Sequence, residues 1–337
     1  MTVTLEATRG SDFAKLSQRI RKEGLLDRRP GYYALRIGVV AAVYVGGWVS
    51  FALVGNSWWQ AAVGVLLALA YAQLALVSHD LAHRQVFRSQ RRTEVAGLIA
   101  GNLGIGMSYG WWMNMHTRHH ANPNHEDDDP DVAPDILIWS KRQAAKANPV
   151  ARVIGRWQAF LFFPLLLLEG FNLHVSSARG LTRPGLKRRA AEATILYGHF
   201  ALYLAAVFLT LSPGKAVVFI LAHQCLFGLY LGATFAPNHK GMPMLTDEDK
   251  LDFLRRQVLT SRNVAGGVWL DVLYGGLNYQ IEHHLFPSMP TPNLRKARPI
   301  VEEYCASLGV PYVATGVFDS YRQALRHLHQ VGEPLRK

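Results

Sequence analysis

Four apolar segments, each of about 20 residues, constrain this chain more than any other feature of its sequence. They cover residues 33–54, 57–78, 193–212 and 215–236. Their charged residues, Arg36 and Lys215, stand near segment ends, where long side chains are expected to reach lipid headgroups. A soluble helix keeps a polar stripe, which these segments lack. We therefore predict an all-α integral membrane protein with four transmembrane helices, rather than a soluble protein with four buried helices.

The connections between these segments predict their topology. Short connections within the first pair and within the second pair indicate two helical hairpins, and they carry almost no positive charge. Basic residues instead gather before the first segment: Arg9, Lys15, Arg19, Arg21, Lys22, Arg28 and Arg29. By the positive-inside rule, both termini and residues 79–192 are expected on the cytoplasmic side of a multi-pass protein in the cell membrane. The helices outside the two hairpins would form a cytoplasmic cap.

Three parts follow from this layout. We predict a cytoplasmic N-terminal segment over residues 1–32, a membrane domain over 33–310 and a helical cytoplasmic tail over 311–337. Two shorter apolar stretches, near residues 95–113 and 157–173, contain tryptophans and are expected to be interfacial or re-entrant.

Three compact clusters hold seven of the fourteen histidines. Their sequences are "HDLAH", "HTRHH" and "QIEHH". Their histidines, with the glutamine that begins the third, are His79, His83, His116, His119, His120, Gln280, His283 and His284. Histidines three or four residues apart share one face of a helix, which suits the binding of one metal ion. Adjacent histidines diverge by roughly 100° and can reach two different ions. Because neutral histidine is the commonest metal ligand, the three clusters together predict a metal centre at the cytoplasmic ends of the hairpins.

Further histidines are weaker candidates. His239 follows the fourth apolar segment at the same expected membrane depth as His79, and we predict that it is an additional ligand. The roles of four others stay open: His125, His174, His199 and His223. The last two lie within apolar segments, which favours a structural role.

An acidic stretch follows the second histidine cluster. Its Asn-Pro and Asp-Pro pairs predict that the helix ends near Ala121 and that a loop begins there. The loop contains Glu126, Asp127, Asp128, Asp129 and Asp131. We expect these carboxylates to orient imidazole rings or to pair with arginine and lysine, rather than to bind metal directly.

Seven or eight histidines exceed the three or four ligands of one tetrahedral zinc ion, so two metal ions are the natural count. Nitrogen ligation without thiolates is compatible with iron, zinc or copper. The predicted position at the mouths of a membrane bundle indicates a substrate with a lipid-soluble part.

The three clusters, ordered along two membrane hairpins, closely resemble the three histidine boxes of the membrane fatty acid desaturase superfamily. That superfamily also contains hydroxylases, acetylenases and alkane-oxidising enzymes. The resemblance covers about residues 33–310, and the stretches "GWWMNMHTRHHANPN", "APNHKGMP" and "QIEHHLFPSMP" look most like actinobacterial acyl desaturases.

This resemblance implies a di-iron enzyme that uses O2 and electrons from an external reductant to desaturate a long acyl chain. The implied ligands are His79, His83, His116, His119, His120, His239, His283 and His284. Gln280 stands where many members have histidine. A glutamine there resembles the front-end desaturases, which act between an existing double bond and the carboxyl end, but bacterial enzymes of other regioselectivity also carry it.

The resemblance also bears on partners. Many front-end enzymes carry a fused haem domain with a His-Pro-Gly-Gly signature, which this sequence lacks. We therefore expect a separate small electron carrier, such as ferredoxin with its reductase, and the net charge of +12 suits an acidic one. Membrane lipids are expected partners, whereas dispersed charge without a recognisable motif argues against nucleic acid.

The substrate head group stays open between coenzyme A, acyl carrier protein and lipid. Basic residues that could meet its phosphates are Arg88, Arg91, Arg92, Lys141, Arg142, Lys187, Arg188 and Arg189. The same residues are equally typical of the cytoplasmic face of any membrane protein. A hydroxylase, acetylenase or oxidative decarboxylase on the same scaffold is the alternative reaction. A metal transporter is a more remote alternative, because transporters hold their ions near the bilayer midplane, whereas the histidine clusters are expected at the helix ends.

Overall fold

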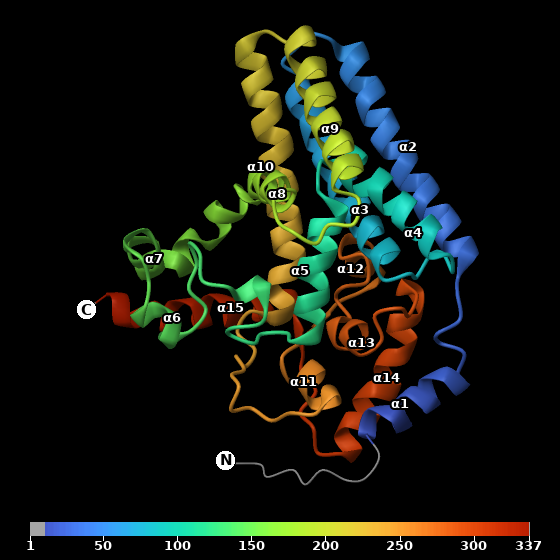
Figure 1. The fold of residues 1–337 in the computed structure, drawn as a ribbon, viewed down its shortest axis with the longest axis vertical. Helices are drawn as coiled ribbons and strands as arrows, with labels where there is room; N and C mark the ends of the chain where they lie inside the picture. The colour runs from blue at the N-terminus through green and yellow to red at the C-terminus, as the bar shows by residue number, and fades with distance from the viewer. Residues whose placement is uncertain (1–10, 337) are drawn as a thin grey trace.

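The computed structural model describes residues 11–336 and consists almost entirely of helices (Figure 1). Four of them are long and apolar enough to cross a membrane: α2 (Pro30–Val54), α3 (Gln60–Ala82), α9 (Arg189–Thr210) and α10 (Pro213–His239). They confirm the four predicted segments as helices. Both α3 and α10 run several residues beyond the apolar stretch, so their last turns carry His79 and His239 out of the apolar bundle.

The bundle is held by close packing of α3 against α10. A side chain at Gly64 of α3 would bring its Cβ within 3.2 Å of the backbone oxygen of Phe219 on α10, so glycine allows the two helices to approach closely. Beside this crossing, Leu67, Tyr71 and Phe227 are buried in the bundle core. The outer faces of α2 and α9 are apolar and exposed, as for Leu53 and Leu209, which is the surface that lipid tails would cover.

The two charged residues of the apolar segments take different environments. Lys215 stays at the end of the bundle, where its Nζ donates to the carbonyl of Asn56 at 2.8 Å. Arg36 forms a buried ion pair with Asp80, 2.5 Å away on α3. The expectation that Arg36 reaches the headgroups is therefore wrong, because Asp80, inside the first histidine cluster, supplies a nearer partner.

Two further helical regions flank the bundle. The first joins α4 (Gln90–Gly97) to a π-helix, η1 (Leu98–Ile105). The second joins α7 (Pro149–Leu166) to α8 (Glu169–Gly180) at an angle of 85°. Pro164 near the end of α7 removes a backbone donor, which favours the break. Length and composition alone allow the α7–α8 pair to be a broken span or a re-entrant loop.

The remaining elements gather at one end of the bundle (Figure 1). They are α1 (Asp12–Lys22), α5 (Tyr109–Ala121), η2 (Pro130–Val132), α6 (Lys141–Ala145), α11 (Phe253–Leu259), β1 (Asn263–Ala265), α12 (Val268–Leu273), α13 (Gln280–Leu285), α14 (Thr291–Ser307), β2 (Ala314–Gly316), α15 (Val317–Val331) and η3 (Glu333–Leu335). Strands β1 and β2 form a short parallel pair. A core that includes Leu16, Ile281 and Val301 joins α1, α13 and α14.

The predicted tail is helical where α15 forms, and Leu328 of α15 packs with Phe162 of α7. The first ten residues, including Arg9, lie outside the described residues. The predicted boundaries at residues 32 and 310 stay predictions, as does the cytoplasmic position of the cap.

Candidate metal centre

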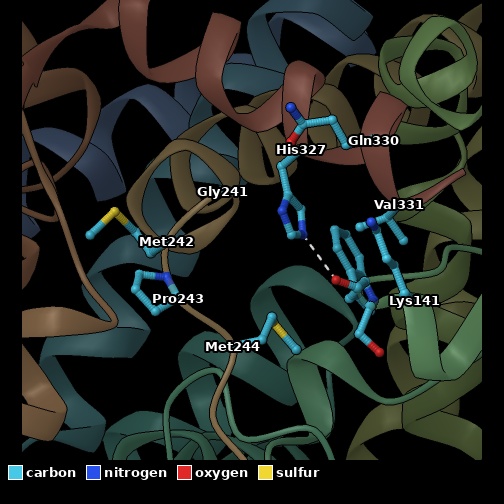
Figure 2. A pocket seen from close by; sticks show the side chains of 10 residues that line it. Lys141, Gly241, Met242, Pro243, Met244, His327, Gln330 and Val331 are labelled. Atoms are coloured by element: carbon cyan, nitrogen blue, oxygen red, sulfur yellow. Dashed lines mark hydrogen bonds between the residues drawn. The ribbon is translucent and has the colours of Figure 1, made fainter. Parts of the chain in front are cut away.

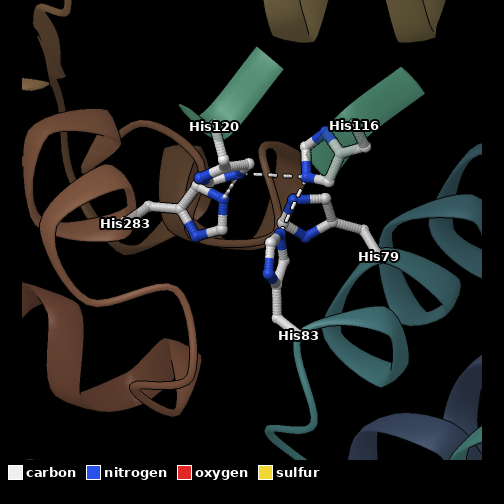
Figure 3. Close-up of side chains that lie close together, drawn as sticks. All are labelled: His79, His83, His116, His120 and His283. Carbon is white, nitrogen blue, oxygen red and sulfur yellow. Dashed lines mark hydrogen bonds between the residues drawn. The ribbon is translucent and has the colours of Figure 1, made fainter. Parts of the chain in front are cut away.

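Five histidine side chains converge between the ends of three helices (Figure 3). They come from the end of α3 (His79 and His83), from α5 (His116 and His120) and from α13 (His283). Each offers a ring nitrogen, and these nitrogens all lie within 4.8 Å of one another. We call them the five-histidine group.

The nitrogen spacing in this group suits a shared cation. The Nε2 atom of His116 is 2.7 Å from that of His83 and 3.1 Å from that of His120, which is 3.2 Å from that of His283. Ligand nitrogens about 2.1 Å from one metal ion and at right angles to each other are about 3 Å apart.

His119, His239 and His284 form a second cluster, which we call the three-histidine group. Their ligand nitrogens also lie within 4.8 Å of one another, and all three residues are buried. The two groups adjoin, because the rings of His120 and His284 stack with their centroids 4.3 Å apart.

Helical geometry explains how the sequence divides its histidines between the groups. His116 and His120 are four residues apart on α5 and face the same group, while His119 faces the other. The adjacent His283 and His284 also separate between the two groups. The structure thus brings together all eight predicted histidines. Their role as ligands stays a prediction.

Hydrogen bonds hold the rings of the three-histidine group through Nδ1. His119 Nδ1 donates to the Asp129 carboxylate at 2.9 Å, His239 Nδ1 to the carbonyl of Thr260 at 3.0 Å, and His284 Nδ1 to Gln257 Oε1 at 2.9 Å. A fixed Nδ1–H places the lone pair of the ring on Nε2, which is the arrangement that metal-binding histidines use. Asp129 therefore orients an imidazole, as predicted for the acidic loop.

Gln280 contacts the three-histidine group through its side-chain amide. Its Nε2 lies 2.9 Å from Nε2 of His239, and its Oε1 accepts from Asn238 Nδ2 at 3.2 Å. The sequence places Gln280 in the third cluster, and the structure places its side chain against His239.

The first cluster is anchored through its acidic residue. Thr291 of α14 donates to Asp80 at 3.0 Å, and Tyr33 of α2 donates to Gln85, just after α3, at 2.5 Å. The end of α3 is therefore fixed from two sides, which positions His79 and His83.

Electrostatics in the centre favours neutral imidazoles. Among the histidines of the centre that lie outside α3 and α10, burial, followed by repulsion between neighbouring histidines, holds the pKa well below the usual value for His83, His116, His120, His283 and His284. Burial also opposes protonation of His119, but Asp131 and Asp129 outweigh it and raise its pKa. Burial would raise the pKa of Asp129, but His119 outweighs it and lowers that pKa to about 2.

The donor set fits metal ions. Within residues 11–336, both ring nitrogens of His79 and Nε2 of His284 are buried and have no hydrogen-bond partner. Buried polar atoms without partners are costly, and neutral imidazole nitrogens that converge on a point are compensated by a bound cation. Nitrogen ligands without thiolates suit iron, zinc or copper.

Sequence reasoning missed Gln257. This residue is fully buried on α11, and besides contacting His284 it donates from Nε2 to the carbonyl of His120 at 3.0 Å. It therefore links the second and third clusters. It stands 23 residues before Gln280 in an ordinary helix, and no local pattern distinguishes it.

The four histidines of open role lie outside both groups. Within the bundle, His199 Nδ1 donates to the carbonyl of Leu103, and the hydroxyl of Tyr203 lies 3.0 Å from Nδ1 of His223. His174 lies 2.9 Å from Gln224 Oε1, and His125 lies 3.5 Å from Asp247 on the surface. These contacts support a structural role for His199 and His223.

A surface pocket of about 480 Å³ lies apart from the centre (Figure 2). Its lining includes Met242, Met244 and His327, and His327 Nε2 donates to the carbonyl of Trp139 at 2.9 Å. None of the predicted ligands lines this pocket.

Comparisons with known proteins agree with this geometry. The family model described as "Fatty acid desaturase" matches residues 56–316. An acyl-lipid (9-3)-desaturase of Physcomitrium patens is 31% identical over 96% of this chain and 63% of its own length, so the chain spans less than two thirds of that relative. The Delta(6)-fatty-acid desaturase fat-3 of Caenorhabditis elegans is 28% identical over 100% of this chain and 78% of its own. A Delta(8)-fatty-acid desaturase of Helianthus annuus is 28% identical over 94% of this chain and 72% of its own length.

Proposed function

The chain belongs to the fatty acid desaturase family, and we propose that it introduces a double bond into a long acyl chain at a centre of two iron ions. The observation that carries this proposal is that the five-histidine group and the three-histidine group adjoin at the end of an apolar helical bundle. The resemblance to actinobacterial enzymes is part of the proposal.

The residues of this chain would hold the two ions in defined positions. The five-histidine group would bind one ion and the three-histidine group, with Gln280 beside it, the other. Iron bound there would supply the activation of O2, and the overall reaction converts two adjacent methylenes, O2, two electrons and two protons into an alkene and two waters.

The surrounding side chains would orient the ligands and exclude water. Asp129, Thr260 and Gln257 fix three imidazoles through Nδ1, so these three rings would not have to turn when metal binds. Trp112 stacks on His116 with a centroid separation of 4.4 Å and shields that ring. Such fixed positions matter because a misplacement of about 1 Å can slow a reaction by about 100-fold.

The position of the double bond is proposed to be of the front-end type. Gln280 at the third histidine cluster supports this, and so do relatives whose names specify Delta(6) and Delta(8) activity. The electrons would come from a ferredoxin or similar acidic carrier with its reductase, since the chain has a net charge of +12. The centre would face the cytoplasm at the cell membrane.

The test is expression in a host with a ferredoxin system, followed by fatty-acid profiling that locates double bonds. We expect a new unsaturated acid that requires O2, and two iron ions per purified chain. His283→Ala should abolish both, whereas His329→Ala, an exposed histidine on α15, should preserve both. An alcohol, alkyne or terminal alkene as the main product contradicts desaturation, and metal flux into vesicles without oxygen-dependent turnover contradicts an enzyme.

A further inference from the structure

A short segment, residues 260–262, joins α11 to β1 and runs against the end of α10. All of its residues are fully buried. The carbonyl of Thr260 accepts from Nδ1 of His239, and the backbone N–H of Arg262 donates to the carbonyl of Asn238 at 2.8 Å. The segment therefore contacts both the imidazole ring of His239 and the backbone of the helical turn that carries it.

The side chain of Arg262 extends these contacts to both sides of His239 in the chain. Its Nε donates to the carbonyl of Pro237 at 2.6 Å, and its Nη2 donates to the carbonyl of Lys240. The last carbonyls of a helix lack partners within the helix, which makes them available to these donors. The third nitrogen, Nη1, donates to Oε1 of Gln323 on α15 at 2.6 Å. One guanidinium group therefore bridges the end of α10 and α15.

Helix α15 packs against the same end of α10 (Figure 1). Because Pro237 has no backbone N–H, the carbonyl of Ala233, four residues earlier, has no donor within the helix. The hydroxyl of Tyr321 on α15 donates to that carbonyl. Just after α10, Gly241 turns the chain with φ 86°, and a Cβ there would lie 3.0 Å from the carbonyl oxygen of Gln323. Helix α15 therefore helps to fix the end of α10.

Arg262 brings a positive charge to this position without a carboxylate to balance it. Its three side-chain acceptors are neutral oxygens, and within the described part of the chain no ion pair within 4.0 Å involves it. Burial lowers the pKa of Arg262 to about 10, so the group stays charged at neutral pH. The carboxylates that adjoin the three-histidine group, Asp129 and Asp131, gather around His119 instead. The charge beside His239 is therefore uncompensated.

We propose that Arg262 is a positioning residue for His239 and that its charge favours the lower oxidation state of an ion held by the three-histidine group. This inference rests on the metal binding in the proposed function. Without the guanidinium group, the turn that carries His239 would lose two buried donors, and His239 would not stay aligned with His119 and His284. A buried positive charge also opposes an increase of charge on a nearby metal ion, because the protein interior screens it weakly.

Metal retention against a graded series of chelator concentrations tests the positioning role. Arg262→Met keeps much of the length of the side chain but removes all of its donors. Groups that orient metal-binding histidines typically contribute about 10–100-fold to metal affinity, so we expect one of the two ions to leave at a chelator concentration about ten-fold lower than in the parent chain. The ion of the five-histidine group should stay. Arg262→Lys keeps the charge and a donor, so it should lose less.

Gln158→Leu is a matched control for the loss of support from α15. Gln158 of α7 is buried, and its Nε2 donates to the carbonyl of Ile138 and to that of Leu328 on α15, at 3.0 Å each. Its replacement should lower the melting temperature but leave both ions in place, because it lies outside both histidine groups. If Arg262→Met retains both ions as well as Gln158→Leu does, Arg262 does not position His239 and the proposal is overturned.

Gln323→Glu separates the charge of Arg262 from its hydrogen bonds. The new carboxylate keeps an acceptor for Nη1 of Arg262 and neutralises the guanidinium charge. We expect this variant to retain both ions, whereas the midpoint potential of its iron, measured by redox titration of the iron-loaded chain, should be lower than that of the parent. Gln330→Glu places the same charge at an exposed position further along α15 and should leave the potential unchanged. Equal potentials in the parent chain and in Gln323→Glu overturn the role of the charge.

Turnover in the same preparations tests the proposed function separately. A parent chain that holds two ions and forms no alkene, while its variants lose metal and shift in potential as expected, refutes desaturation and supports the role of Arg262. A parent chain that forms an alkene, while Arg262→Met retains both ions, supports desaturation and overturns the role of Arg262.

Discussion

Gln257 offers the sharpest test of how the metal centre is built. It is fully buried and makes two hydrogen bonds: its Nε2 donates to the carbonyl of His120, and its Oε1 accepts from Nδ1 of His284. Those two histidines belong to different groups, and their rings stack. Gln257→Leu keeps the approximate volume of the side chain but removes both hydrogen bonds, so it should disturb both groups together.

The expected size of the effect follows from these two contacts. The Nδ1–H of His284 would lose its acceptor while buried, and an unsatisfied buried donor costs about 1–3 kcal/mol. Residues that orient metal-binding histidines typically contribute about 10–100-fold to metal affinity. We therefore expect Gln257→Leu to weaken metal binding by about 10–100-fold and to lower stability by about 1–3 kcal/mol. Gln257→Glu retains an acceptor for His284 and should lose less.

The assay is total metal content per chain after dialysis against a graded series of chelator concentrations. A matched control is Gln143→Leu, because Gln143 is also a buried glutamine with two backbone hydrogen bonds, to Trp139 and Val132, but lies outside both histidine groups. It should lower the melting temperature without changing metal retention. If Gln257→Leu retains metal as well as Gln143→Leu does, Gln257 has no orienting role and the reasoning is wrong.

Three further predictions concern other parts of the molecule. His120→Ala should reduce iron content and turnover without changing membrane insertion, and normal iron content would refute its assignment as a ligand. Gly228→Ala should destabilise the protein by about 1–3 kcal/mol in a thermal melt, because the new Cβ on α10 would lie 2.3 Å from the backbone nitrogen of Gly170 on α8. An unchanged melting temperature would show that α8 and α10 can move apart without cost. Glu192→Gln should also lower the melting temperature, by removing the charged acceptor of Ser108 at the start of α5, and a melting temperature equal to that of the parent chain would contradict this anchoring role.

The bundle could be predicted because its signal is local. A run of about 20 apolar residues identifies a spanning helix without knowledge of its neighbours. The predicted segment 33–54 corresponds to α2 over Pro30–Val54, and the predicted 193–212 corresponds to α9 over Arg189–Thr210. The ends differ by a few residues because polar residues continue a helix beyond the apolar core. The partner of Arg36 was missed because Asp80 stands 44 residues away and only tertiary packing joins them.

The histidine groups could be predicted only in part, because contacts between distant segments depend on tertiary packing. Spacing within a cluster predicts which rings share a face, so the division of His119 from His116 and His120 follows from helical geometry. The sequence does not reveal which histidine of one cluster meets which of another, because that depends on how α3, α5 and α13 cross. Gln257 and Thr260 escape notice for this reason, since their contacts reach across the fold from ordinary positions. Asp129 was predictable because it lies ten residues from His119 in a loop tied to the same helix.

Gln280 shows what the structure adds to a residue that the sequence could only flag. Nδ1 of His239 donates to Thr260, so Nε2 of His239 is an acceptor with one lone pair. In this structure the amide nitrogen of Gln280 faces that lone pair at 2.9 Å. The lone pair cannot both accept this hydrogen bond and bind a metal ion. Metal binding by the three-histidine group therefore requires the amide nitrogen of Gln280 to turn away from His239. The amide could then point its oxygen toward the metal ion, because a cation attracts a carbonyl oxygen. The orientation of the Gln280 amide would therefore change when a metal ion binds to the three-histidine group. An apolar side chain at this position has no amide group to reorient.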